Sequence, residues 1–230
     1  MDVIGHRGAA ALARENTAEA LRAGLASGAD GVEIDLRLSS DGVLVLMHDA
    51  DLARTTGAVG RVAETLASDL RSLGVATFDE ALETVPSDKT LIVELKGTPW
   101  DAGHDPTEPV ARAVSPALRD ARRRIVVSSF NPLALAVVRE LAPGVATAVL
   151  TPAAFDLESN LAAALDGEHA ECHVPAEILD RAFVDRAHEH GKRVVAWTVN
   201  DPATVSMLAG WSVDGVITDD PRVALNALGR

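Results

Sequence analysis

Residues 31–37, Gly-Val-Glu-Ile-Asp-Leu-Arg, form a short apolar run that carries two carboxylates, Glu33 and Asp35, two positions apart. Successive side chains of a β-strand point to opposite faces, so this spacing places both carboxylates on one face. A second run, Thr90–Leu95, repeats the arrangement with Glu94 and Lys96. The two runs therefore predict strands that carry charged side chains on a common face, near the strand ends.

Short apolar runs of this kind alternate along the whole chain with longer segments rich in Ala and Leu. Such alternation of strands and helices is the signature of a parallel sheet. Eight strands are expected, the number that closes an α/β barrel of the TIM (β/α)8 type. They are predicted at Val3–His6, Gly31–Arg37, Thr90–Leu95, Ile125–Ser129, Val145–Leu150, Glu171–Val174, Arg193–Thr198 and Gly215–Thr218.

The helices are predicted between these strands, and several begin at recognisable signals. Asn16, with Glu19 three residues later, fits a capping box. Asp201 and Asp220 each precede a proline, which is favoured at the first helical position. The predicted helices are Thr17–Ala26, Phe78–Thr84, Pro109–Asp120, Pro132–Leu141, Asn160–Leu165, Ala176–Glu189, Pro202–Ala209 and Pro221–Leu228.

The alternation is interrupted after the second strand. Ser39-Ser-Asp-Gly42 is a turn signal, and the apolar run Val43–Met47 follows at once, so we expect the second strand to fold back as a hairpin. The hairpin would return His48 to the level of the two carboxylates on that strand. Residues 49–75 are too long for an ordinary connection, and we expect them to form an inserted cap over the active face of the barrel.

The composition fits one domain over residues 1–230. With 47% hydrophobic residues the chain is long enough to bury a full core, and a single α/β barrel has about this size. The net charge of −13 creates a field that repels phosphate backbones and anionic membranes. We therefore expect no nucleic-acid partner. An anionic substrate would need a local reversal of this field by cations such as Arg7, Lys96 and a bound metal.

Nothing at the N-terminus resembles a signal peptide, and no run of ~18 apolar residues occurs. We therefore expect a cytoplasmic protein without stable membrane association. Cys172 is the only cysteine, so no intramolecular disulfide can form, and a buried structural thiol is the expected state. The oligomeric state does not follow from the sequence.

The predicted strand ends bring together three kinds of chemical group. Two histidines can share general acid and base work, because imidazole titrates near neutral pH. Three carboxylates offer hard oxygen ligands, which suit Mg²⁺ or Ca²⁺ better than Zn²⁺. Two cations can stabilise negative charge on a substrate. The members are His6 and His48, then Glu33, Asp35 and Glu94, and finally Arg7 and Lys96.

These residues occur in an order that resembles the glycerophosphodiester phosphodiesterase family. The resemblance extends over nearly the whole chain. Each motif alone is weak, but seven in one order, with the Leu52-x-Arg54-Thr55-Thr56 start of the insertion, are specific. The seven are His6-Arg7-Gly8, Glu15-Asn16-Thr17, Glu33-x-Asp35, His48-Asp49, Glu94-x-Lys96, Trp197-Thr198-Val199-Asn200 and Asp214-Gly215-Val216-Ile217-Thr218-Asp219.

The resemblance implies a TIM barrel with a small insertion after the second strand. It also implies metal-dependent hydrolysis of glycerophosphodiesters to glycerol 3-phosphate and an alcohol. The three carboxylates would then bind the divalent metal, and His6 and His48 would serve as base and acid, in an order left open. By the same resemblance Glu15 and Asn16 line the mouth of the site. Analogy with related barrels also leaves open a cyclic intermediate formed by a glycerol hydroxyl.

Several of these residues also have a structural interpretation. Glu15 and Asn16 could form no more than a helix cap, and Phe130 and Trp197 could belong to the core. Aromatic residues make up only 3% of the chain and none is Tyr, so we expect Phe130 and Trp197 to wall the substrate glycerol. The same scarcity argues against a choline-selective aromatic cage. The remaining histidines are expected to be structural, namely His104, His169, His173, His188 and His190.

Three other functions compete with this interpretation. A lysophospholipid-acting phosphodiesterase would need an exposed apolar rim, and no amphipathic basic stretch for a membrane surface is evident. A catalytically inactive barrel that binds a phosphate ligand would retain the fold, but no histidine or carboxylate of the set is missing. A Schiff-base aldolase would use Lys96, but Glu94 on the same strand face would hold that lysine charged and unreactive.

Overall fold

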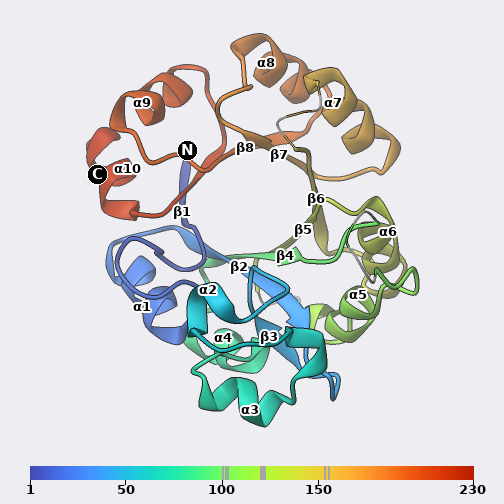
Figure 1. Cartoon of the computed structure of the whole chain (residues 1–230). Coiled ribbons are helices and arrows are strands. Elements are labelled where there is room, and N and C mark those ends of the chain that lie inside the picture. Colours follow the sequence, from blue (N-terminus) through green and yellow to red (C-terminus); the bar gives the residue numbers. More distant parts are fainter. Residues whose placement is uncertain (100, 102–103, 120–122, 153, 155) are drawn as a thin grey trace.

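The computed structural model describes residues 1–230 except 100, 102–103, 120–122, 153 and 155. Within this part, eight parallel strands form a closed ring with helices around it (Figure 1). The ring closes because β1 pairs with both β9 and β2, so the predicted TIM barrel is confirmed. Its strands are β1 (Asp2–Gly5), β2 (Gly31–Leu38), β4 (Thr90–Leu95), β5 (Ile125–Ser129), β6 (Ala146–Leu150), β7 (Glu171–Pro175), β8 (Arg193–Trp197) and β9 (Gly215–Thr218).

The hairpin expected after the second strand is present. β3 (Leu44–Leu46) runs antiparallel to β2, with Leu36 opposite Leu46. The backbone N–H of Met47 then donates to the carbonyl of Asp35, 3.0 Å away. This pairing fixes the level at which His48 leaves the sheet, next to the charged end of β2.

Helices pack around the outside of the ring (Figure 1). Two predicted helices are shorter by several residues in the structure. α8 begins at Arg181, because Asp180 caps it by accepting from the N–H of Phe183. α5 ends at Val114, and Asp120, the last residue predicted for that helix, lies outside the described residues. The main helices are α1 (Ala18–Ala26), α4 (Phe78–Thr84), α5 (Pro109–Val114), α6 (Pro132–Leu141), α7 (Leu157–Asp166), α8 (Arg181–Glu189), α9 (Pro202–Gly210) and α10 (Pro221–Ala227), with a 3-10 turn η2 (Ala117–Arg119) after α5.

The capping box expected at Asn16 and Glu19 is not formed. The cap of α1 is Thr17, whose hydroxyl accepts from the N–H of Ala20 at 3.2 Å. Asn16 instead adopts a left-handed φ of 56° and turns its side chain toward Asp35. That interpretation was wrong because Asn16 and Thr17 are both good caps, and the buried Asp35 offers the asparagine a stronger partner.

Two apolar layers hold the barrel together. The larger one lies between the ring and the surrounding helices and includes Leu21, Val32 and Phe183. The smaller one fills the inside of the ring, and its buried members are Ile4, Ile92, Val126, Ala148, Val195 and Ile217. Across the described ranges, no helix combines the length and the apolar character needed to cross a membrane.

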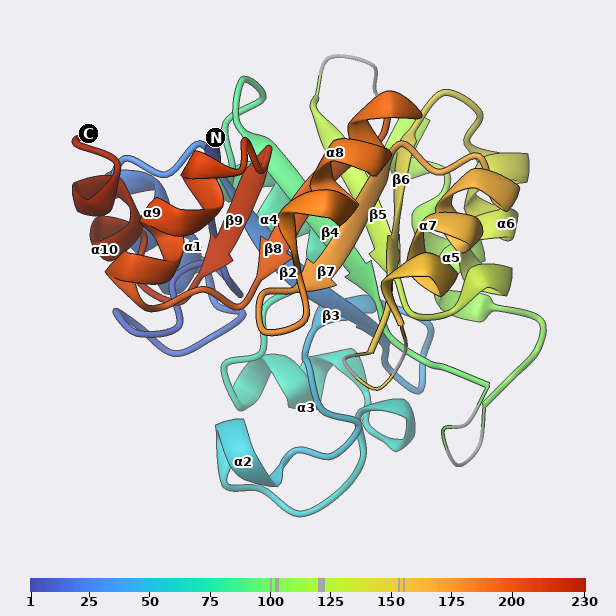
Figure 2. The same ribbon diagram turned by 90° about the horizontal axis from the view of Figure 1, so that it is seen from above.

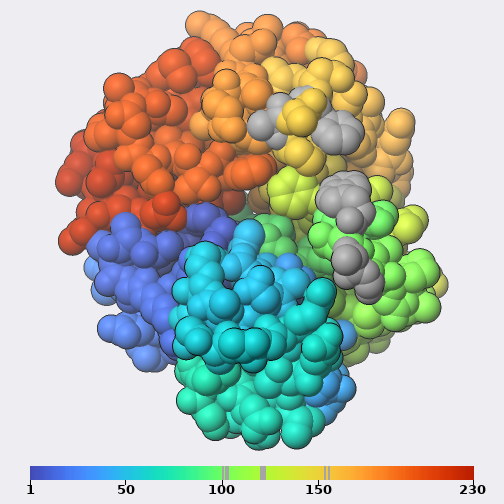
Figure 3. Space-filling model, viewed as in Figure 1, coloured from blue at the N-terminus to red at the C-terminus, as the bar shows by residue number. Residues whose placement is uncertain are grey.

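The segment between β3 and α4 lies at the end of the barrel toward which the strands point (Figure 2). It contains α2 (Ala53–Thr56), η1 (Val62–Glu64) and α3 (Ala67–Ser72). In the view down the barrel it borders a central hollow (Figure 3). Apolar side chains of this segment pack against the hairpin in a small cluster. Its buried members are Val45, Met47, Leu52, Val62, Leu70 and Val75. The interpretation of residues 49–75 as a cap stays a prediction.

Candidate active site

A cavity of about 160 Å³ lies within the ring at the C-terminal ends of the strands. This is the end at which barrels of this type place their functional residues. Most of the residues singled out in the sequence line it, namely His6, Arg7, Glu33, His48, Glu94, Lys96, Phe130 and Trp197. Residues that were not predicted also line it, namely Ser128, Leu150, His173, Thr198 and Ile217.

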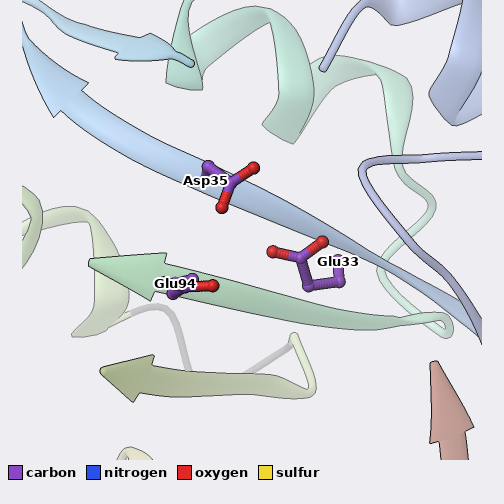
Figure 4. Close-up of side chains that lie close together, drawn as sticks. All are labelled: Glu33, Asp35 and Glu94. Carbon is purple, nitrogen blue, oxygen red and sulfur yellow. The ribbon is translucent and has the colours of Figure 1, made fainter. Parts of the chain in front are cut away.

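Three carboxylates converge beside this cavity from two neighbouring strands (Figure 4). Glu33 and Asp35 come from β2 and Glu94 from β4, and Asp35 stands opposite Glu94 in the sheet register. One oxygen from each lies within 4.8 Å of the other two. Oε1 of Glu33 is buried and has no hydrogen-bond partner among the described residues. Such a cluster, with an unsatisfied buried oxygen, fits a hard divalent cation.

The electrostatic environment shifts the pKa values of the two carboxylates of β2 in opposite directions. Burial and the nearby charge of Asp35 raise the pKa of Glu33 to about 8. Burial also opposes ionisation of Asp35, but the positive charge of Lys96 holds the pKa of Asp35 well below its usual range. Without an ion, Asp35 is therefore the charged member of the pair, and Glu33 keeps its proton.

Two cations contact the carboxylates, each at a different oxygen of Asp35. Nζ of Lys96 lies 2.9 Å from Oδ1 of Asp35 and also contacts Glu94. Nε of Arg7 lies 3.4 Å from Oδ2 of Asp35. Burial lowers the pKa of Lys96, but the charges of Glu94 and Asp35 raise it above its usual value. Both cations thus stay charged at the edge of the cavity.

His6 is held by a carboxylate from the opposite end of the sequence. Its Nδ1 lies 2.6 Å from Oδ1 of Asp219, and Oδ2 of Asp219 accepts from the amide of Asn200 at 2.6 Å. The N–H of Asp219 in turn donates to Oδ1 of Asn200. Burial lowers the pKa of His6, but the hydrogen bond to Asp219 opposes this effect, and the pKa of His6 lies above its usual value.

His48 has a similar partner with a different setting. Its Nδ1 lies 2.7 Å from Oδ1 of Asp49, but Oδ2 of Asp49 binds Arg54 at 2.6 Å. The carbonyl of His48 accepts two hydrogen bonds from Arg37, at 3.0 and 2.7 Å. Burial and the charge of Lys96 lower the pKa of His48. The two histidines therefore differ, with the pKa of His6 raised and that of His48 lowered.

Glu15 and Asn16 do not line the cavity but bind charged residues next to it. Glu15 accepts from Arg7 at 2.8 Å and from both terminal nitrogens of Arg54 at 2.7 Å. Asn16 donates to Oδ2 of Asp35 at 2.7 Å and accepts from its backbone N–H at 3.1 Å. Both residues thus orient charged groups of the site.

Phe130 and Trp197 meet edge to face, with ring centroids 5.8 Å apart. They line the cavity and also an adjoining larger one of about 370 Å³, which includes Thr98 and Pro152. Nε1 of Trp197 is buried without a partner in the described part of the chain. The aromatic pair therefore forms a wall shared by an inner and an outer compartment.

The model of the glycerophosphoryl diester phosphodiesterase family matches residues 6–223. The chain belongs to this family. The match begins at His6 and ends beyond Asp219, so it contains every residue of the cavity. The family predicted from the order of the motifs is thereby confirmed.

Individual members of the family are similar over their full length. The glycerophosphodiester phosphodiesterase of Caldanaerobacter subterraneus is 28% identical, with 99% of this chain and 98% of the relative covered. A solved Oleispira antarctica phosphodiesterase, in complex with its product sn-glycerol-3-phosphate, is 27% identical with a TM-score of 0.87 over 100% of this chain and 97% of its own. The solved glycerophosphodiester phosphodiesterase of Thermotoga maritima is 30% identical, with a TM-score of 0.83. The match covers 100% of this chain and 98% of the Thermotoga chain.

Sequence reasoning did not predict the residues that hydrogen-bond to the two predicted histidines. Asp49 and Asp219 stood in quoted motifs, but their contacts with the two histidines were not predicted: Asp49 binds the adjacent His48, and Asp219 meets His6 only because the barrel closes. Arg37 follows the carboxylates of β2 by two positions, which was an available signal that it shares their face. His173 was expected to be structural, yet it lines the cavity.

Proposed function

We propose that this phosphodiesterase hydrolyses glycerophosphodiesters to glycerol 3-phosphate and an alcohol, using two histidines beside a divalent metal site. One observation carries the proposal: two histidines, two cations and the carboxylates Glu33 and Glu94 line a single small cavity, with Asp35 in the same carboxylate cluster, in a member of the family. The full set is present, which favours turnover over the binding of a phosphate ligand alone.

Glu33, Asp35 and Glu94 are the residues that would hold the metal, and their all-oxygen donor set favours Mg²⁺ or Ca²⁺. When bound, such an ion supplies Lewis acidity and a template for the phosphoryl group. The unpartnered Oε1 of Glu33 supports this assignment, because a buried carboxylate oxygen normally has a partner.

Arg7 and Lys96 bind the phosphoryl oxygens in this proposal. Nucleophilic attack concentrates negative charge on these oxygens, so fixed positive charge nearby lowers the barrier. Both cations are held in place by carboxylates before substrate arrives, which limits the reorganisation that catalysis requires. Glu15 and Asn16 contribute by positioning Arg7 and Asp35.

His6 and His48 exchange protons with the nucleophile and the leaving alcohol. Each has its Nδ1 against a carboxylate, so Nδ1 carries the proton of the neutral ring and Nε2 is left for catalysis. One histidine takes the proton from the nucleophile, and the other donates one to the departing alkoxide. Phe130 and Trp197 wall the substrate, with the glycerol in the inner compartment and the alcohol toward the outer one.

Residues 49–75 are proposed to cap the site as part of a single domain over residues 1–230. Arg54 supports this role, because it joins the capping segment to Glu15 and to the partner of His48. The sn-glycerol-3-phosphate bound by the Oleispira relative supports a small-molecule substrate of the same class here.

The direct test is to incubate the purified protein with glycerophosphodiesters and with lysophospholipids, with and without a chelator. We expect glycerol 3-phosphate to be released only when Mg²⁺ or Ca²⁺ is present, and Asp35→Ala to abolish the release. Asp30→Ala is the matched control, because Asp30 binds Arg230 and does not line the cavity. Release of glycerol 3-phosphate without a metal would contradict the assignment of the carboxylates as metal ligands. Cleavage of lysophospholipids alone would show that these, and not glycerophosphodiesters, are the substrates. Binding of a glycerophosphodiester without release of product would indicate an inactive barrel.

A further inference from the structure

His173 is a buried histidine that the proposed reaction does not use. It lies on β7, is 0% exposed and lines the active-site cavity. In the sheet register it stands next to Leu150 of β6 and Val195 of β8. Since Val195 belongs to the apolar layer that fills the ring, His173 lies at the floor of the cavity.

One edge of the His173 ring is already bound. Its Nε2 lies 3.0 Å from Oε2 of Glu171, and Oε1 of Glu171 accepts from Arg193 at 3.1 Å. Burial raises the pKa of Glu171, but the His173 bond and the charge of Arg193 lower it below its usual value. Glu171 is therefore an ionised acceptor, so Nε2 of His173 carries a proton.

The other edge of the ring is unsatisfied. In a neutral imidazole that is protonated at Nε2, Nδ1 is a hydrogen-bond acceptor. Nδ1 of His173 is buried and has no partner among the described residues. A buried acceptor that stays unpaired loses its bonds to water without replacement, which destabilises the folded chain. The free nitrogen therefore points to a donor that arrives with a ligand.

The bond to Glu171 indicates which way the free nitrogen points. The two ring nitrogens of imidazole point in nearly opposite directions. Glu171 precedes His173 by two residues on the same strand, so Nε2 faces the N-terminal end of the barrel. Because His173 lines the cavity and its Nε2 is held by Glu171, we infer that Nδ1 lies toward the C-terminal end, where the proposed substrate would bind.

The size of the cavity fits a glycerol moiety. It measures about 160 Å³, and a cavity of about 150 Å³ holds benzene, which has six non-hydrogen atoms, as glycerol has. Leu150 and Ile217 provide apolar contacts for the carbon chain. A glycerol hydroxyl is a donor of the kind that Nδ1 lacks.

We propose that Nδ1 of His173 accepts a hydrogen bond from a free hydroxyl of the substrate's glycerol moiety and thereby selects glycerol over alcohols that lack this hydroxyl. The inference rests on the proposed function and deepens it by naming a specificity-determining residue. His173 takes no part in proton transfer.

Two substitutions separate the two edges of the ring. His173→Asn places an amide oxygen near the position of Nδ1 but does not reach Glu171. His173→Gln reaches Glu171 with its terminal amide and leaves nothing at the position of Nδ1. A purely structural histidine would tolerate the glutamine better, because it keeps the bond to Glu171. A substrate-binding histidine would tolerate the asparagine better.

The substrates are 4-nitrophenyl phosphodiesters of glycerol, propane-1,2-diol and propane-1,3-diol, and each diol lacks one glycerol hydroxyl. For the wild type we expect kcat/KM with one diol to be about 10-fold lower than with glycerol, the effect of about one net hydrogen bond. His173→Gln should lose this discrimination, and His173→Asn should keep most of it. His169→Gln is the control, because His169 is buried against Thr147 and does not line the cavity.

Calorimetric binding of glycerol 3-phosphate and the two diol phosphates gives a second readout that needs no turnover. The inference is overturned if His173→Gln discriminates between the glycerol and diol compounds as strongly as the wild type does. The proposed function would still stand in that case, provided that the wild type hydrolyses the glycerol diester. If no variant hydrolyses any diester, the proposed function fails, and the binding data alone decide the role of His173.

Discussion

Nζ of Lys96 lies 2.9 Å from Oδ1 of Asp35, so a fixed cation already contacts the carboxylate cluster. This contact explains why Asp35 stays ionised while its neighbour Glu33 is driven toward the protonated form. The metal-free site thus stores one proton, which an ion bound as proposed would have to displace.

The stored proton makes the stability of the metal-free protein depend on pH. The pKa of Glu33 is raised from 4.5 to about 8, so between these values the folded chain holds a proton that the unfolded chain has released. Stability is therefore highest below about pH 4.5 as far as Glu33 is concerned, and falls as pH rises toward 8. Raising a pKa by one on folding corresponds to about 1.4 kcal/mol.

Glu33→Gln should remove most of this dependence. In chelator, we expect the melting temperature of the wild type to fall more steeply between pH 5 and 8 than that of the variant. Adding Mg²⁺ or Ca²⁺ should raise the wild-type value at pH 8 and leave the variant nearly unchanged. Parallel curves for the two proteins would show that Glu33 is ionised in the folded state.

The two histidines should behave as a unit. His6→Ala and His48→Ala should each lower kcat by roughly 10² to 10⁴, because each removes one proton transfer. The double variant should be little worse than the worse single one. A diester with a nitrophenolate leaving group needs no protonation, so it should rescue the variant that lacks the acid. Equal rescue of both variants would contradict a paired acid and base.

Asp219→Asn should alter His6 without removing it. The carboxylate raises the pKa of His6, so its loss should move one limb of the kcat/KM pH profile to lower pH. The limb that moves identifies the role: the acidic limb if His6 is the base, the alkaline limb if it is the acid. We also expect kcat to fall roughly 10- to 100-fold, since a charged hydrogen bond is worth about 1.5–3 kcal/mol.

The control for this experiment is Asp214→Asn. Asp214 binds His188 at 2.8 Å in a similar pair that does not line the cavity. Its loss should leave the pH profile unchanged. An unchanged profile in Asp219→Asn as well would mean that Asp219 does not act on His6 during catalysis.

Arg54→Ala should weaken catalysis by loosening the capping segment. Arg54 binds both Glu15 and Asp49, so its loss leaves Arg7 and His48 less well positioned. We expect kcat/KM to fall about two- to five-fold and stability to change by less than about 1 kcal/mol, as for other exposed ion pairs. The control is Arg71→Ala, which breaks an ion pair with Glu80 (N···O distance 3.0 Å). This pair does not line the cavity, so its loss should have no kinetic effect. Equal kinetics for the two variants would show that the ion pairs of Arg54 with Glu15 and Asp49 do not contribute to catalysis.

The fold followed from the sequence because strand and helix signals are local. The alternation of apolar runs predicted the ring, and the turn at residues 39–42 predicted the hairpin that returns His48. Helix bounds were less accurate where competing caps occur in sequence. Asn16 was assigned to a cap, but its tertiary partner Asp35 was 19 positions away and invisible to a local argument.

The site was predictable only to the extent that its members lie on strands of known spacing. The three carboxylates were grouped correctly because side chains two apart share a face. The proposed role of His173 depends on the lack of a partner for its Nδ1 among the described residues, and this shows only when β7 is placed between β6 and β8. The same is true of Asp219, which stands 213 positions from His6.

That pairing of His6 with Asp219 imposes an order in time. A ribosome delivers β1 first and β9 almost last, and the two strands are neighbours in the finished ring. A nascent chain therefore presents His6 without its carboxylate for nearly the whole of synthesis. Partly translated or truncated chains would carry the carboxylate cluster but an unsupported histidine, so competence for catalysis would arrive in one late step.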